Sequence, residues 1–248
     1  MRSGPKRKAI SKPEPVVKVE VEITGFEKLK SAIESNRTTL VKNCLDGFSD
    51  LQDLPKMCAL TQLAVTNSNV KIIKLLLENS FPYDSDCLCY LTRNNKYDIL
   101  KILLQNLNNC SDGRDIGSKL KVFFVAASDP NVKALKLFIE NNFFSPDEAY
   151  AGEGLLSIAC VVSSANSCVN VLKLLLDSGW DLNFVGQMGF NALHSAIAQR
   201  GPLGAVALLL ERGADIEGPS ENDSGSRPLH IGIGTYIFNK YFICFIFP

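Results

Sequence analysis

The sequence predicts an all-α solenoid, in which short helix-turn-helix units stack side by side and β-turn fingers project between them. Two observations lead to this prediction. Apolar runs with helical spacing occur in pairs, and an apolar triplet recurs at offsets of 32, 27, 35, 37 and 34 residues. A turn plus two helices repeats about every 33 residues. Because two short helices cannot bury their apolar faces alone, each unit needs copies beside it.

The clearest unit lies between Gly189 and Glu217. A turn glycine opens it, and an apolar run with helical spacing follows, including Ala196. Gly201 and Pro202 then break the pattern, and a second helical run ends at Gly213. This order predicts two helices joined by a tight turn.

The register of the copies comes from the apolar triplet of each second helix. A small residue stands eleven positions before the triplet in the first two copies, at Ala32 and Ala64, and twelve before it in the sixth, at Ala196. The sixth copy therefore has one extra residue in its turn. The triplets are Asn43-Cys44-Leu45, Leu75-Leu76-Leu77, Ile102-Leu103-Leu104, Leu137-Phe138-Ile139, Leu174-Leu175-Leu176 and Leu208-Leu209-Leu210.

A second column of residues follows each second helix. Its regular recurrence predicts packing between repeats, in preference to a ligand cage. The residue before it is often one that tolerates the left-handed conformation with which helices end, namely Gly47, Asn106, Asn142, Gly179 or Gly213. The column itself consists of Phe48, Phe81, Leu107, Phe143, Trp180 and Ala214.

These motifs resemble a known family. Ala192-Leu193-His194-Ser195-Ala196 and Pro228-Leu229-His230-Ile231 are similar to the Thr-Pro-Leu-His-x-Ala signature of ankyrin repeats. The segments 171–179 and 208–215 resemble the second helix of that family and the turn after it. The resemblance covers Gly25 to Ile233, which corresponds to six repeats and the start of a seventh. It implies an ankyrin-repeat solenoid.

The first five copies depart from the signature because they lack its histidine. Gln62, Cys89 and Ser157 stand near its place. In ankyrin repeats that side chain makes local hydrogen bonds, so the resemblance implies that the early repeats are less rigid.

Three segments follow from this reading. Residues 1–24 form a disordered basic tail, residues 25–233 form the repeat domain, and residues 234–248 form an atypical apolar tail. We expect this last segment to be an aberrant or truncated end, because it has neither a helix-pair pattern nor the polar outer face of a terminal repeat. A membrane anchor is the alternative, although the apolar run is shorter than the about 18 residues of a membrane span. Within the basic tail, Lys6, Arg7 and Lys8 resemble a nuclear-import signal, with a solubilising tail as the alternative.

Composition limits the classes of function. Lysine plus arginine equals aspartate plus glutamate, at 26 each, so bulk charge favours neither nucleic acid nor an anionic membrane. The eight cysteines form no pair of CxxC motifs, which predicts buried free thiols and no zinc site. No secretory signal is recognised at the start. We expect a monomer without metal or cofactor, in the cytoplasm, the nucleus or both.

No catalytic pattern is found. His194 and His230, the two histidines, both occupy the structural position of the repeat signature, with no nucleophile patterned around either. The polar stretch Asn108 to Gly117 is predicted to be a loop. It is either a recognition insertion or a flexible segment that tolerates change.

The predicted function is a non-enzymatic scaffold or adaptor that binds partner proteins. The resemblance implies contacts at the finger tips and the exposed positions of the first helices. Two alternatives remain: the regulatory N-terminal region of a larger protein, such as a channel or chromatin enzyme, and a nuclear transcriptional adaptor. The candidate partner-binding residues are Glu153, Leu155, Ile158, Gln187, Met188, Phe190 and Ser195.

Overall fold

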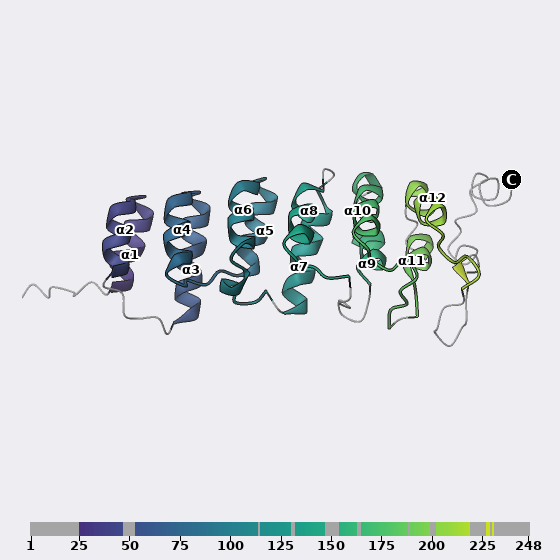
Figure 1. Ribbon diagram of the computed structural model, residues 1–248, viewed down its shortest axis with the longest axis horizontal. Coiled ribbons are helices and arrows are strands. Elements are labelled where there is room, and N and C mark those ends of the chain that lie inside the picture. The colour runs from purple at the N-terminus through teal and green to yellow at the C-terminus, as the bar shows by residue number, and fades with distance from the viewer. Residues whose placement is uncertain are drawn as a thin grey trace, which may run out of the picture.

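The computed structural model describes residues 25–46, 53–113, 115–129, 132–146, 154–162, 165–187, 189–198, 202–218, 227–228 and 230. Within these ranges twelve α-helices form six pairs, which stand side by side in one row (Figure 1). The pairs are α1 Gly25–Glu34 with α2 Thr38–Asp46, α3 Leu54–Thr66 with α4 Val70–Glu78, α5 Ser85–Arg93 with α6 Tyr97–Leu104, α7 Ile116–Ala127 with α8 Lys133–Glu140, α9 Leu155–Val162 with α10 Ala165–Asp177, and α11 Ala192–Ala198 with α12 Leu203–Glu211. The predicted all-α solenoid is confirmed.

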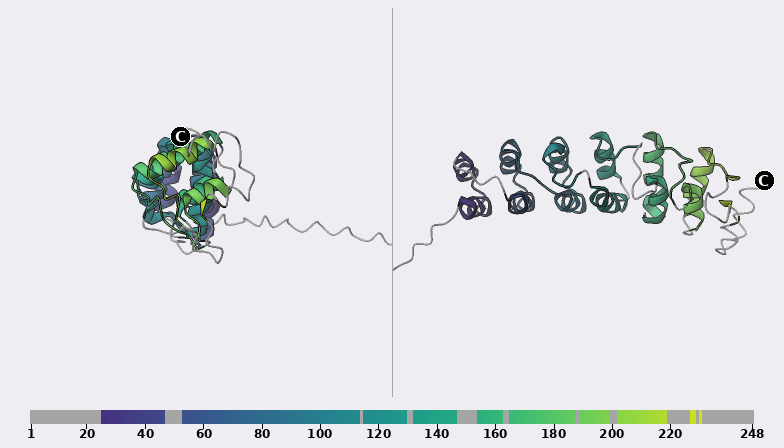
Figure 2. Two further views of the ribbon diagram at one scale, coloured as in Figure 1. Left: turned by 90° about the vertical axis from the view of Figure 1, so that its right-hand side faces the viewer. Right: turned by 90° about the horizontal axis from the view of Figure 1, so that it is seen from below.

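Neighbouring pairs stack through like helices. Each first helix contacts the first helix of the next pair, from α1 with α3 to α9 with α11. Second helices of neighbouring pairs are also in contact, for example α2 with α4 and α6 with α8. The solenoid is therefore two helices deep, and both rows are visible from below (Figure 2).

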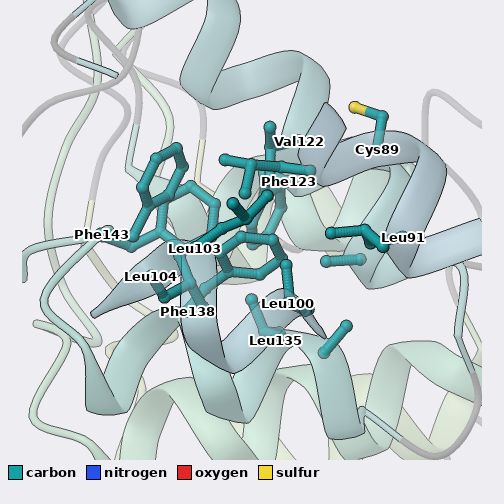
Figure 3. Close-up of a cluster of buried hydrophobic side chains, with 14 of the residues drawn as sticks. Cys89, Leu91, Leu100, Leu103, Leu104, Val122, Phe123, Leu135, Phe138 and Phe143 are labelled. Atoms are coloured by element: carbon teal, nitrogen blue, oxygen red, sulfur yellow. The ribbon is translucent and has the colours of Figure 1, made fainter. Parts of the chain in front are cut away.

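The core runs along the row between the two layers of helices. Phe123 of α7 and Phe138 of α8 pack against α6 residues such as Leu103 in the cluster of Figure 3, which joins the third and fourth repeats. The middle residue of the triplet is fully buried in repeats two to six, which confirms the predicted register. These residues are Leu76, Leu103, Phe138, Leu175 and Leu209.

Most second helices end with one left-handed residue, and the residue after it turns back into the core. Ser80 has φ 61°, and the backbone N–H of Phe81 donates to the carbonyl of Leu76 at 3.0 Å. Asn142, Gly179 and Gly213 have φ values of 55°, 93° and 90°, as predicted for these positions. This arrangement satisfies carbonyls that the helix end leaves unpaired.

Asn106 is an exception, and the prediction for it is wrong. Its φ is −119°, because the chain continues from α6 into the short 3₁₀ helix η1, Leu107–Asn109. The fourth repeat is thus approached by an extra turn of chain. Gly47 lies outside the described residues.

The column after the second helices is part of the core between repeats, as predicted. Phe81, Phe143 and Trp180 are buried, while Leu107 and Ala214 pack partly against the same core. Phe143 contacts the ring of Phe138 with centroids 5.2 Å apart. Phe48 lies outside the described residues.

The two terminal segments predicted from the sequence, the basic tail and the apolar tail, lie outside the described residues. These are residues 1–24 and 234–248. Within the described part, no helix has the length and apolar character needed to cross a membrane.

Candidate partner-binding surface

The burial of the residue at the position of the signature histidine differs from one first helix to the next. The burial pattern of α5 and α9 places Cys89 and Ser157 at the position that His194 occupies in α11, and all three side chains are buried. The equivalent position is exposed in α3, where it holds Gln62. In α7 it holds Phe124, whose side chain is 43% exposed. The sequence reading did not single out this phenylalanine, because the fourth repeat lacks the signature that would locate it.

His194 has a structural role, as predicted. Its backbone N–H donates to Oδ1 of Asn191 at 3.0 Å, and its Nδ1 lies 2.7 Å from the same oxygen. The ring is buried and stacks on Phe190, with centroids 5.7 Å apart. His230 repeats part of this arrangement, since the backbone N–H of Arg227 donates to its Nδ1 at 3.3 Å. Both histidines thus belong to local turn geometry.

The finger between the fifth and sixth repeats is a tight turn. The N–H of Gly186 donates to the carbonyl of Phe190 at 3.0 Å, and the N–H of Gly189 donates back to Gly186 at 2.8 Å. Gly189 has φ 76°, a conformation that favours glycine. The turn exposes Gln187 at its tip. Met188 lies outside the described residues.

The other predicted contact residues differ in exposure. Ile158 and Ser195 are half-buried on α9 and α11, so part of each side chain reaches the surface. Leu155 is fully buried, and we therefore remove it from the proposed surface. Its position at the start of α9 directs it into the core, which the apolar spacing alone did not distinguish from an exposed finger position. Glu153 lies outside the described residues.

The loop predicted at 108–117 is shorter in the structure, because residues 108–109 belong to η1 and α7 begins at Ile116. It is held in place through residues 109–112, which we call the strap. The strap pairs with Tyr83 through the backbone: the N–H of Tyr83 donates to the carbonyl of Asn109 at 2.9 Å, and the N–H of Ser111 donates to the carbonyl of Tyr83 at 2.8 Å. Asp112 accepts from the N–H and the hydroxyl of Ser85, the first residue of α5, at 2.8 and 2.7 Å. The strap thereby caps the third repeat, a role that neither sequence alternative included.

A hollow of about 440 Å³ lies beside the strap. Its lining includes Ser111, Lys119 of α7 and Phe143 at the end of the fourth repeat. In the fifth repeat the corresponding place, between the start of α9 and the chain after α10, encloses only about 20 Å³ and is covered by Phe184. The finger side of the solenoid therefore offers recesses of different size.

Burial controls the titratable groups near the strap. It raises the pKa of the Cys110 thiol from its ordinary value to about 12, and it also raises the pKa of Cys87, Cys58 and Tyr83. These thiols stay protonated at neutral pH. Over the described ranges, no three His, Cys, Asp or Glu side chains come together as a metal site would require.

Comparison with known proteins identifies the repeat. Residues 123–220 match the family model described as ankyrin repeats, three copies. The crystal structure of the ankyrin repeat domain of Bcl-3, described as a unique member of the IkappaB protein family, is similar with a TM-score of 0.61. The likeness has 21% sequence identity and covers 82% of this chain and 92% of that one, so it shows the fold alone. No curated protein matched the sequence.

Proposed function

Because the chain is an ankyrin-repeat protein, we propose that it acts as a non-enzymatic scaffold or adaptor and that partner proteins bind its finger side. The observation that carries the proposal is the finger of residues 186–189. A hydrogen-bonded turn fixes its shape, and Gln187 is exposed at its tip. A finger whose two ends are held by hydrogen bonds loses less conformational entropy when it binds, which favours recognition.

The proposed contact surface extends from this tip over α9 and α11. Ile158 and Ser195 lie on neighbouring first helices that pack against each other, so one partner can contact both. Phe190 contributes mainly by holding the finger, since its ring stacks on buried His194. Glu153 and Met188 stay in the proposal from the sequence alone.

Affinity capture from cell extract tests this surface. Gln187→Arg with Ser195→Arg adds charge and bulk where the partner is expected, without removing the stacked Phe190. The matched control is Lys173→Glu with Lys74→Glu, which also changes two exposed residues, on the second helices α10 and α4. Circular dichroism first establishes equal folding of all three proteins.

Proteins that bind the wild type and the control, and are lost with the double arginine variant, support the proposal. If the same proteins are captured by all three, the contact surface lies elsewhere. Turnover of a substrate by the purified chain would contradict the non-enzymatic part. Light scattering tests the further expectation that the chain is a monomer.

A nuclear adaptor is a second candidate, and one sequence feature favours it. Pro5 precedes the basic residues at 6–8, as in short import signals. Alanine at residues 6–8 tests whether these side chains are required for nuclear accumulation.

A further inference from the structure

Trp180 is the chain's single tryptophan, and its indole N–H is an unusual group in this structure. The side chain follows α10 and is only 6% exposed. Among the described residues its Nε1 is the one buried side-chain nitrogen or oxygen that has no hydrogen-bond partner. Leaving such a donor unpaired destabilises the folded state, and a buried tryptophan N–H usually finds an acceptor.

The indole borders a small cavity on the finger side of the fifth repeat. The cavity encloses about 20 Å³ and has mainly apolar walls, to which Pro146, Leu155 and Leu182 contribute. One water-sized oxygen needs about 10–15 Å³, so the space admits a single acceptor atom. Asp181 also lines the cavity, and its carboxylate disfavours a second negative charge nearby. A neutral carbonyl oxygen therefore fits both the size and the charge of the cavity.

Phe184 covers the cavity and is the residue whose movement would enlarge it. Its side chain is 37% exposed, so little core packing holds its outer edge. A Cβ added to Gly154 would lie 2.8 Å from Cδ1 of this ring, which shows how closely the ring lies over the backbone. Because Gly154 has no side chain, the Phe184 ring can lie over the cavity.

We propose that this cavity is a recognition pocket for a partner's peptide carbonyl, which accepts a hydrogen bond from Nε1 of Trp180, while an adjoining apolar side chain displaces Phe184. The inference rests on the proposed function, because it assigns a chemistry to one part of the finger side. Exposed protein segments present neutral carbonyls beside apolar side chains in large number. An interior water is the competing occupant, since Ser157 and Asp181 also line the cavity and interior waters make about three hydrogen bonds. The probe and the variants below separate the two occupants.

Nuclear magnetic resonance of the full chain tests the pocket directly. A protein with one tryptophan gives one indole N–H resonance in a nitrogen–proton correlation spectrum. The probe is N-acetyl-L-leucine methylamide, which carries two peptide carbonyls and one apolar side chain. We expect a saturable shift of the indole resonance together with the backbone resonances of Gly154 and Phe184.

Three variants make the result specific. Trp180→Phe keeps an aromatic ring but removes the donor, so we expect the probe to bind about 10-fold more weakly, as followed on the Gly154 amide. Phe184→Ala removes the cover and should strengthen binding. The probe's free acid, N-acetyl-L-leucine, should bind more weakly than the amide, and Asp181→Asn should reduce that difference.

Two outcomes would overturn the inference: an indole resonance that the probe leaves unchanged in wild type and Phe184→Ala alike, or equal probe affinity in wild type and Trp180→Phe. Either would show that Nε1 of Trp180 does not recognise a peptide carbonyl. Because Phe184→Ala alters a partly exposed residue, it keeps the test valid even where Trp180→Phe fails to fold. If the capture experiment succeeds while the probe fails, the scaffold function stands and only this pocket is refuted.

Discussion

Replacing Asp112 with alanine should destabilise the protein far more than its place in a polar loop suggests. The carboxylate accepts two hydrogen bonds from Ser85, one from the backbone N–H at 2.8 Å and one from the hydroxyl at 2.7 Å. Ser85 is only 3% exposed, and it begins α5. Without Asp112, both donors lose their acceptor, and the strap loses its attachment to the third repeat.

The magnitude follows from these two bonds. A buried donor left without a partner costs about 1–3 kcal/mol, and bonds to a charged acceptor lie toward the upper part of that range. The hydroxyl can rotate to another acceptor, whereas the backbone N–H cannot move. We therefore expect Asp112→Ala to lower the free energy of unfolding by about 2–3 kcal/mol. Asp112→Asn should lose about half as much, because its amide oxygen still accepts one bond.

Urea unfolding followed by circular dichroism measures these differences. Asp98→Ala is the matched control, since it removes an exposed carboxylate from the first turn of α6, with an expected change of about 0.5 kcal/mol or less. If Asp112→Ala and Asp98→Ala shift the urea midpoint equally, the strap does not cap the third repeat. An unchanged midpoint for Asp112→Ala would refute the reasoning outright.

Three further predictions concern stability and location. Ser80→Gly should raise the free energy of unfolding by about 0.5–1 kcal/mol, because Ser80 has φ 61°; an unchanged urea midpoint would contradict this. Burial raises the pKa of the Cys87 and Cys110 thiols above their ordinary value of 9.0. The free energy of unfolding should therefore be highest at neutral pH and should decrease above about pH 9, where the thiols ionise in the unfolded chain but stay protonated in the folded one. Urea unfolding in reducing buffer at several pH values would show this loss, and a midpoint independent of pH would argue against it. Alanine at all three of residues 6–8 should reduce nuclear accumulation of a fluorescent fusion, and an unchanged distribution would disprove the import signal.

The repeat register could be predicted because it depends on spacing alone. Buried residues such as Leu76 recur at intervals of 27 to 37 residues, and the chain must repeat them for each helix pair to pack on the next. The buried column at Phe81 and Trp180 follows from the same geometry, since one residue turns back into the core after a left-handed one. The repeat spacing and the turn after each second helix are therefore enough to predict the stacked helix pairs.

The candidate site was harder to predict, because exposure depends on neighbours that spacing does not show. Leu155 and Ile158 lie three residues apart on α9, yet one is fully buried and the other is half-buried. The pairing of Asp112 with Ser85 spans 27 residues, and no local motif indicates it. The unpaired Nε1 of Trp180 likewise appears only when the surrounding side chains are in place.

The early repeats show how a divergent sequence keeps the fold without the signature histidine. Their helix starts and turns are joined by side chains across repeats. The amide of Asn69 donates to Oδ1 of Asn36 at 2.6 Å, from the second repeat to the first, while Oδ1 of Asn69 caps α4. The hydroxyl of Tyr97 donates to Asp129 at 3.1 Å, from the third repeat to the fourth.

These bonds change what the missing histidine implies. Each joins one repeat to the next, whereas the contact between Asn191 and His194 stays within one repeat. Stability in a solenoid is the sum of terms within repeats and terms between neighbours. Later repeats are also joined to their neighbours, as by the ion pair of Arg212 with Asp177 at 2.8 Å, and the reduced rigidity implied by the resemblance stays a prediction. Hydrogen exchange after Asn69→Ala would test it, because a loss of protection that spreads into both α1 and α4 requires coupling between the repeats.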